Sequence, residues 1–424
     1  MRVELAYGET GLVVDLPSDR TTVVVPRQIE PVADERAAVL DALRRPTVGA
    51  PLRERVRPGQ RVAISICDGT RPQPRRVVVP AVLDELEGVV DADDVVVLVA
   101  TGTHRGNTAA ELDDMLGREV LDRVRVVNHD ARDDASLRWV GEMAGDVPVW
   151  LNAEWTDADV RITTGFVEPH FFAGFSGGPK MVAPGLAGLD TVLALHDARR
   201  IGDERATWGV TVGNPVHDAV REIAAATGVD FAVDVLLDRD HRIVEVFAGD
   251  LLEEHAAACA AARRVAMVPV PSMFDVVVTT NAGFPLDQNL YQCVKGISAG
   301  AGILRPGGTL ICVAECRDGF PDHGSYREVL ASAPSPEDLL HSIEARTTTV
   351  PDQWQVQVQA RVQAKARVLL HTSGLTAQDL ATAHLGHTVD IGATVRDELH
   401  RQGPDAILCA LPEGPQTIPY VEAT

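Results

Sequence analysis

Residues 61–104 read RVAISICDGTRPQPRRVVVPAVLDELEGVVDADDVVVLVATGTH, and their pattern indicates the fold class. It holds two apolar, β-branched runs, RVAISI (61–66) and DVVVLVATGT (94–103), separated by a segment with helical spacing. A second helical pattern and a third run, RVRVVNHD (123–130), follow. This β-α-β-α-β order predicts a doubly wound parallel sheet, in which ligands bind beyond the carboxyl ends of the strands.

Polar side chains follow these strands where each one ends. Asp68, Thr70 and Arg71 come after the first strand, and His104 comes after the second. A further strand-like segment begins at residue 159 and runs into a loop rich in glycine and proline that ends near residue 185. Because carboxyl ends of parallel strands share one rim of a sheet, we expect these loops to form a site.

The whole chain is expected to be of the α/β class, with two α/β domains, largely parallel sheets and an active site in the cleft between the domains. The first domain is predicted over residues 1–266, joined by residues from about 395 to 424. The second is predicted over residues 272–394, after a linker-like segment, VAMVPVPSM.

Composition excludes several classes of partner. The formal net charge of −22 repels polyanions, so neither nucleic acid nor an anionic membrane is expected to bind. No apolar run approaches the length of a membrane span, and the N-terminal segment has the features of neither a signal peptide nor a transit peptide. The six cysteines are scattered, which indicates reduced thiols in a cytoplasmic protein.

Four histidines are candidate functional groups: His104, His129, His170 and His196. Taken one at a time, each is explained as well by a surface or hydrogen-bonded role. His104 and His170 gain weight because both follow strands, in loops expected on the same rim.

A glycine-rich segment, Ser176-Gly177-Gly178-Pro179-Lys180, resembles a phosphate-binding loop without the spacing of a P-loop. A flexible loop with a solvated lysine is the alternative, although the phenylalanines just before it favour a firmly seated loop. Further along, Gln292 and Lys295 would share one face of a helix and could hold a carboxylate, or could simply form a solvated face.

Taken in order, these motifs resemble the nickel-pincer-nucleotide-dependent lactate racemase family, which inverts 2-hydroxy acids. The motifs run through nearly the whole chain: Asp68-Gly69-Thr70-Arg71-Pro72, Thr101-Gly102-Thr103-His104-Arg105, Glu168-Pro169-His170, Ser176 to Lys180, Pro184-Gly185, His196, Gln292 to Lys295, and Asp352-Gln353-Trp354.

The resemblance implies a cofactor, a pyridinium-3,5-bisthiocarboxylic acid mononucleotide that carries nickel, covalently attached at Lys180. It implies His196 as the protein ligand of nickel, a role that imidazole suits. His104 and His170 would be the acid/base pair, with Arg71 near the substrate oxygen. The other implied roles are carboxylate binding by Gln292 and Lys295, and cofactor binding by Asp68, Thr70, Ser176, Gly177, Gly178 and Trp354.

The implied reaction moves a hydride transiently from the substrate to the cofactor, by way of a planar 2-keto acid. The resemblance also implies cofactor-maturation enzymes as partners. It does not specify the oligomeric state. Pro179 departs from the basic residue expected before the tethering lysine. Three alternatives stay open: a racemase or epimerase for malate, longer aliphatic or aromatic 2-hydroxy acids or sugar acids; a non-catalytic nucleotide-binding homologue; and a zinc hydrolase built on three histidines.

Overall fold

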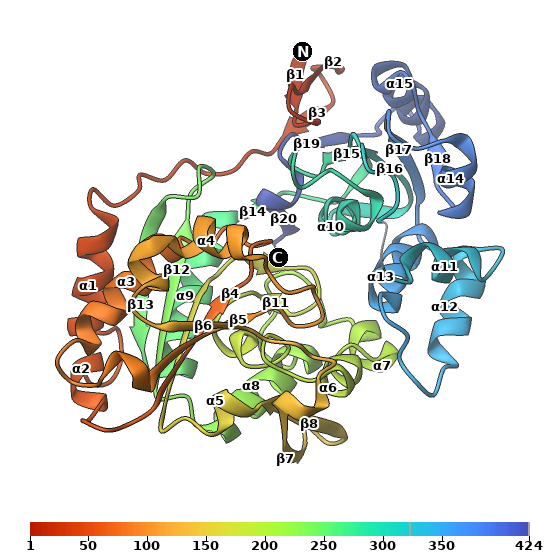
Figure 1. The fold of residues 1–424 in the computed structure, drawn as a ribbon. Coiled ribbons are helices and arrows are strands. Elements are labelled where there is room, and N and C mark those ends of the chain that lie inside the picture. The colour runs from red at the N-terminus through yellow and green to blue at the C-terminus, as the bar shows by residue number, and fades with distance from the viewer. Residues whose placement is uncertain (322–323, 423–424) are drawn as a thin grey trace. The chain divides into compact units, whose positions relative to one another are not determined.

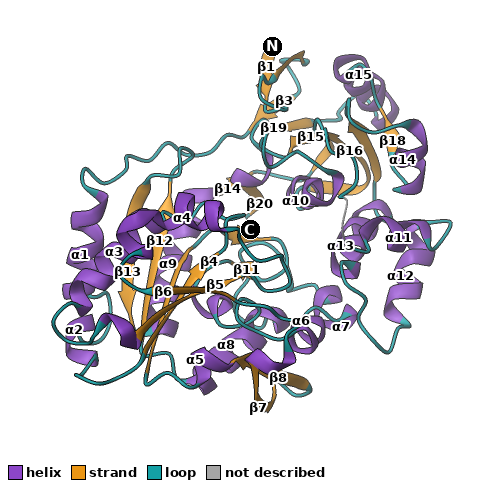
Figure 2. Ribbon diagram, in the orientation of Figure 1, coloured by secondary structure: helices purple, strands orange, loops and turns teal. Residues whose placement is uncertain are grey.

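The computed structural model describes residues 1–321 and 324–422, and the chain forms two compact units (Figure 1). Unit 1 comprises Met1–Arg27, Asp197–Glu204 and Arg264–Thr424, and unit 2 comprises Gln28–His196 and Arg205–Arg263. Each unit combines helices with a largely parallel sheet (Figure 2). The α/β class predicted from the sequence is therefore confirmed.

Unit 2 is built on a six-stranded sheet in the order β13-β12-β9-β4-β5-β6. Its strands are β4 (Val62–Cys67), β5 (Val95–Ala100), β6 (Arg125–Asn128), β9 (Val160–Phe166), β12 (Phe231–Leu237) and β13 (Ile243–Gly249). All neighbouring strands are parallel except β12 and β13. Since β5 lies on one side of β4 and β9 on the other, the winding reverses at β4, and a ligand-binding crevice is expected beyond the carboxyl ends there.

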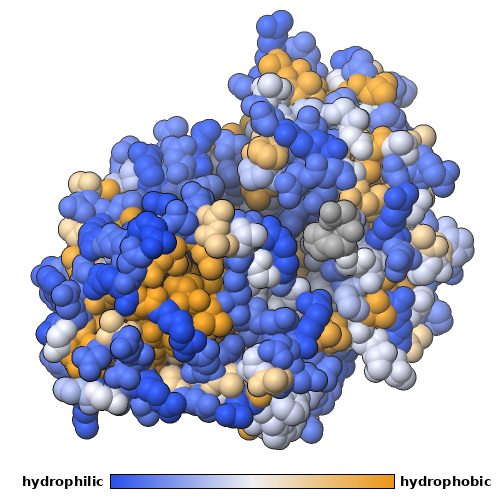
Figure 3. Space-filling model, in the orientation of Figure 1, coloured by the Kyte–Doolittle hydropathy of each residue, from blue (hydrophilic) through white to orange (hydrophobic). Residues whose placement is uncertain are grey.

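Both faces of this sheet are buried, which explains the unbroken apolar runs of its strands. Val62, Ile64 and Ile66 pack in one core with α1 (Glu35–Arg44), α3 (Arg75–Leu86) and α4 (Ala109–Leu121). The opposite core contains residues of α6 (Leu189–Leu195), α8 (Pro215–Thr227) and the hairpin strand β8 (Val147–Asn152). Strand β6 is the half-buried edge, and Figure 3 shows a hydrophobic area around it on a mostly polar surface.

Unit 1 holds a second six-stranded sheet, all parallel, in the order β18-β17-β16-β15-β19-β3. Its strands are β3 (Thr21–Val23), β15 (Phe274–Thr280), β16 (Leu304–Val313), β17 (Arg367–His371), β18 (Gly386–His387) and β19 (Leu408–Leu411). Helices of unit 1 include α7 (Ala198–Gly202), α10 (Leu290–Ala301) and α13 (Gln353–Gln363).

The domain boundaries differ from those expected from the sequence. Residues 1–27 and 395–424 both belong to unit 1, not to the domain that carries β4, β5 and β9. The reason is strand pairing: β3 pairs with β19, which pairs with β15, and helix α15 (Ile391–Gln402) packs in the same core. The expected linker also contains a strand, β14 (Met267–Val270), which pairs with β20 (Ile418–Val421).

No helix among the described residues is long and apolar enough to cross a bilayer.

Candidate active site

Three loops of unit 2 follow neighbouring strands and are hydrogen-bonded to one another. The loop after β9, residues 167–185, is called the lysine loop below because it contains Lys180. Ser65 in β4 donates its hydroxyl to the carbonyl of Met181 at 2.9 Å. Gly102, just after β5, donates its N–H to the carbonyl of Gly185 at 2.9 Å. The structure thus brings together the three strand ends from which the sequence predicted a site.

Asp68, which follows β4, holds His104, which follows β5. The Nδ1–H of His104 donates to Asp68 Oδ2 at 2.6 Å, and the Thr70 hydroxyl donates to Asp68 Oδ1 at 2.6 Å. Because Nδ1 carries the proton, Nε2 of His104 carries the lone pair that a general base needs. The His104 side chain is 47% exposed and that of Asp68 only 4%, so the imidazole is accessible and its carboxylate partner is not.

The carboxylate of Asp68 is kept ionised by its neighbours. Burial, the largest influence, raises its pKa, but the hydrogen bond and charge of His104, the Thr70 hydroxyl and the charge of Arg71 lower it further than burial raises it. The net pKa lies below the ordinary value of 3.8. Asp68 and Thr70 are thus occupied in orienting His104.

Arg75, which the sequence analysis did not select, fixes the loop that carries Asp68. It is 8% exposed, and its guanidinium donates to the carbonyls of Asp68 and Arg71 at 3.0 Å. Burial lowers its pKa, although the side chain remains a cation that binds carbonyl oxygens. A signal was present in the sequence, because an arginine at the start of an otherwise apolar helix is seldom buried without partners.

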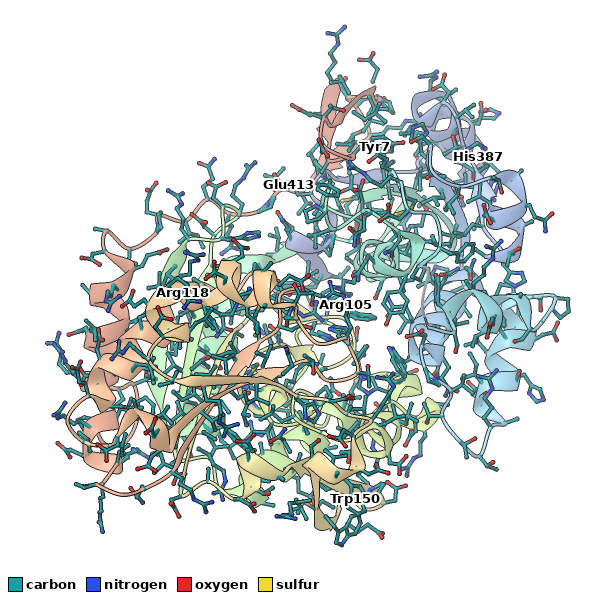
Figure 4. The ribbon with its side chains drawn as sticks, viewed as in Figure 1. Tyr7, Arg105, Arg118, Trp150, His387 and Glu413 are labelled. Carbon is teal, nitrogen blue, oxygen red and sulfur yellow. The ribbon has the colours of Figure 1, made fainter. Side chains whose placement is uncertain are left out.

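The loop after His104 is anchored on its other side. Arg105, labelled in Figure 4, forms an ion pair with Glu111 at 2.6 Å, and Glu111 closes a capping box with Thr108 at the start of α4. These bonds lower the pKa of Glu111 to about 2. The pair is exposed, so it adds little to the stability of the fold and instead fixes the path of the loop.

Phe172 is the meeting point of three predicted site residues. Its ring centroid lies 4.5 Å from that of His170 and 5.3 Å from that of His196. The Lys180 ammonium lies 5.6 Å from the same centroid. Two imidazoles and one amine therefore surround one buried ring in the lysine loop.

The hydrogen bonds of the two histidines assign their tautomers. His170 Nδ1 accepts the backbone N–H of Ala173 at 3.2 Å, which leaves the proton of the neutral ring on Nε2. His196 Nδ1 lies 2.7 Å from the carbonyl of Val192 and donates to it, which leaves the lone pair on Nε2, the atom with which such a ring binds a metal.

Ser176, Gly177 and Gly178 shape the lysine loop. The Ser176 hydroxyl donates to the carbonyl of Phe166 at 2.9 Å and accepts the N–H of Glu168 at 2.9 Å. Gly177 and Gly178 have φ of 74° and 48°, and a Cβ on Gly178 would lie 2.4 Å from the ring of His255. The shape of the loop therefore already accounts for these three residue types, beside the cofactor contacts that the resemblance implies.

The remaining predicted residues lie in unit 1, on two adjacent helices. Gln292 and Lys295 are half-exposed on one face of α10, as their spacing predicted. Trp354 is 8% exposed and is the second residue of α13, whose Gln355 donates to the carbonyl of Tyr291 on α10 at 2.6 Å. The structure therefore groups the predicted residues into two sets, one in each unit.

His129 and the zinc alternative can be assessed directly. His129 is 1% exposed and lies within hydrogen-bond distance of Ala187 and Asn152, and burial lowers its pKa, so its role is structural. Among residues 1–321 and 324–422, no three His, Cys, Asp or Glu side chains are arranged to hold a metal ion. His104, His170 and His196 therefore do not form a zinc site of their own.

Comparison with known proteins gives matches along nearly the whole chain. The family models "Lactate racemase N-terminal domain" and "Lactate racemase C-terminal domain" match residues 7–209 and 270–418. The chain is 32% identical to the lactate racemase of Thermoanaerobacterium thermosaccharolyticum over 421 residues, 98% of each chain. It is also 32% identical to that of Lactiplantibacillus plantarum over 418 residues, 95% of this chain and 98% of the relative.

Solved structures agree with this. The lactate racemase apoprotein from T. thermosaccharolyticum matches with a TM-score of 0.91 and 31% identity, over 99% of this chain and all of the other. A Thermotoga maritima protein, at 18% identity and a TM-score of 0.66, covers 93% of this chain and all of its own and shows a shared fold.

Proposed function

Since this chain belongs to the lactate racemase family and is therefore a racemase, an enzyme of the isomerase class, we propose that it inverts the α-carbon of a small 2-hydroxy acid, with lactate as the first candidate. The observation that carries the proposal is the pairing of His104 with Asp68 beside the lysine loop. Inversion requires a base for the substrate hydroxyl. An accessible imidazole that a buried carboxylate orients is such a base.

The residues of unit 2 also fit the nickel-pincer nucleotide. Lys180 and His196 contact the same ring, Phe172, so an amine for a covalent tether and an imidazole for nickel belong to one small region. A sulfur pincer would supply most of the nickel ligands itself, so one imidazole, His196, is enough as the protein's contribution. When bound, the nucleotide supplies the hydride acceptor.

The protein's own part is to move and hold protons. Nε2 of His104 takes the hydroxyl proton, and the ionised Asp68 stabilises the imidazolium that forms. Inversion would then require the α-carbon to become planar in a 2-keto acid and to be reduced on its other face, while a histidine that holds a proton returns one to the oxygen. His170 donates a hydrogen bond from Nε2–H in this direction; to act as the base for the other enantiomer it would have to carry its proton on Nδ1 and give up the hydrogen bond from the Ala173 N–H.

We assign the substrate carboxylate to Gln292 and Lys295, since a cation and an amide on one helix face match a carboxylate. Arg71 is assigned to the substrate oxygen, and Trp354 to the pocket wall. Activity is expected to fall in acid, because a protonated imidazole cannot accept the hydroxyl proton.

The test uses enzyme produced together with cofactor-maturation enzymes, the proposed partners of this chain. Intact mass, nickel content and chiral chromatography of lactate, malate and longer 2-hydroxy acids are measured together. Lys180→Ala is expected to lose the covalent adduct and turnover, whereas His104→Ala keeps the adduct and loses turnover. Full activity in Lys180→Ala contradicts the tether, and faster inversion of an acid other than lactate changes the assigned substrate.

A further inference from the structure

Two buried carboxyl groups lie against the turn that precedes Lys180, and the chemistry above uses neither. Asp234 belongs to β12 and Glu254 to α9 (Leu251–Ala266); they are 1% and 0% exposed. Asp234 Oδ2 accepts the backbone N–H of Gly178 at 2.8 Å. Asp234 Oδ1 and both Glu254 oxygens have no hydrogen-bond partner from any other group in the described part of the chain. The two carboxyls lie close enough that each changes the pKa of the other.

The turn fits closely onto this layer. His255, next to Glu254 on α9, lies with Nε2 2.8 Å from the carbonyl of Ser176 and donates to it. A Cβ on Gly177 would lie 2.8 Å from Asp234 Oδ1, so only glycine allows the approach. Lys180 directly follows this turn and is bonded to it, because its N–H donates to the carbonyl of Gly177 at 3.1 Å.

Burial makes the two carboxyls retain protons. It raises the pKa of Asp234 to about 7, and burial together with the charge of Asp234 raises the pKa of Glu254 as well. Two adjacent buried carboxyls cannot both ionise cheaply, so the pair keeps a proton near neutral pH and one group donates it to the other.

Among the described residues, no neighbouring cation lowers the pKa of either carboxyl. The titratable and charged groups on the surrounding elements are Cys67 on β4, Lys180 in the turn, His217 and Arg221 on α8, and His255, Cys259 and Arg263 on α9. Burial lowers the pKa of His217 to about 4 and that of His255 to about 3, so both rings are neutral at physiological pH.

We propose that Asp234, Glu254 and His255 are positioning residues for Lys180, and that a proton shared by the two carboxyls keeps the Ser176–Gly178 turn in place. This rests on the proposed function of Lys180 as the tether. Loss of the shared proton puts two negative charges side by side in a buried site, which repels the carboxyls and loosens the turn. Correct placement of Lys180 is therefore present at neutral and lower pH and is lost as pH rises.

The first test is hydrogen exchange of the full-length apoprotein between about pH 6 and pH 9, corrected for intrinsic exchange and read from peptides of the lysine loop. Wild-type protection is expected to fall as pH rises. Glu254→Gln, whose amide donates to Asp234 without titrating, should keep the protection and flatten its pH dependence. Glu254→Leu has no donor, and its lysine loop should exchange about tenfold faster at neutral pH. Glu253→Gln, exposed on the same helix, serves as the control.

The second readout is the mass of the Lys180 adduct after production with the maturation enzymes. Glu254→Leu should carry less adduct than wild type, and Glu254→Gln should carry as much. The proposal is overturned if the lysine loop stays fully protected in Glu254→Leu, or if Glu254→Gln keeps the wild-type pH dependence. It is also overturned if Glu254→Leu loosens the turn and still carries as much adduct as wild type. If Glu254→Leu does not fold, Asp234→Asn decides, because an unchanged pH midpoint in that variant overturns the shared proton.

The exchange measurements do not involve the cofactor. An unmodified Lys180 in mature wild-type enzyme would therefore sink the proposed function, yet leave the result on the turn standing.

Discussion

Replacing Asp68 by asparagine keeps the size of the side chain and removes its charge. In the protein, Asp68 Oδ2 accepts the Nδ1–H of His104, while Oδ1 accepts both the hydroxyl and the N–H of Thr70. An asparagine that keeps its oxygen toward Thr70 turns its NH₂ group toward His104. The imidazole must then carry its proton on Nε2, so it has no lone pair where the substrate hydroxyl arrives.

The size of the effect follows from the bond that is lost. A hydrogen bond to a charged group contributes about 1.5–3 kcal/mol, which corresponds to a loss of about 10- to 150-fold in kcat. Water has little access to the Nδ1 side of His104, because Asp68 is buried there. The His104 side chain is 47% exposed, so water can still reach the imidazole elsewhere and relay a proton. We therefore expect a loss smaller than the roughly 10⁴-fold caused by the same change in a Ser-His-Asp triad.

The assay is chiral chromatography of lactate in both directions, on enzyme matched for nickel content and for adduct mass. Asp113→Asn, an exposed change on α4, is the control and should leave kcat unchanged. A loss of less than about threefold in Asp68→Asn, with adduct intact, would refute the reasoning that Asp68 orients the base.

Three further outcomes are expected. Gly178→Ala places a Cβ against His255 at positive φ and should lower the free energy of unfolding by about 2–4 kcal/mol. Gly59→Ala, also at positive φ but in open space, should lower it by only about 1–2 kcal/mol. Urea unfolding measures both. Arg75→Met leaves loop carbonyls without a donor and should cost about 1–3 kcal/mol together with slower turnover. Because its pKa is lowered on folding, ionised Asp68 stabilises the fold above the ordinary value of 3.8, so wild type should lose its advantage over Asp68→Asn as pH falls below that value.

The sequence allowed much of unit 2 to be predicted because its signals are local. Apolar runs ended in polar residues at 68–71 and 104, and the structure shows β4 and β5 ending there, with Asp68 bonded to His104. The spacing of Gln292 and Lys295 likewise predicted their shared face on α10.

What could not be predicted depends on pairings between distant segments. Strand β3 belongs with β19 at the other end of the chain, and nothing in residues 1–27 specifies that partner. The layer beneath the lysine loop was missed for the same reason, although two signs were visible. Asp234 interrupts the apolar strand FAVDVLL, and Glu254 lies on the face of α9 that Leu251 and Ala258 bury.

The site of unit 2 separates the residues that react from the residues that hold them. Buried polar groups such as Arg75 and Asp234 bond to the backbone of loops, which offsets part of the cost of burying them and orders the loops before a ligand binds. Lys180 projects from one of these loops and His104 from the neighbouring loop after β5, and both side chains contribute less to the core. Changes in the holding residues should therefore lower stability and turnover together, whereas His104→Ala should abolish turnover at nearly unchanged stability. Equal destabilisation by both kinds of change would mean that this division of roles does not exist.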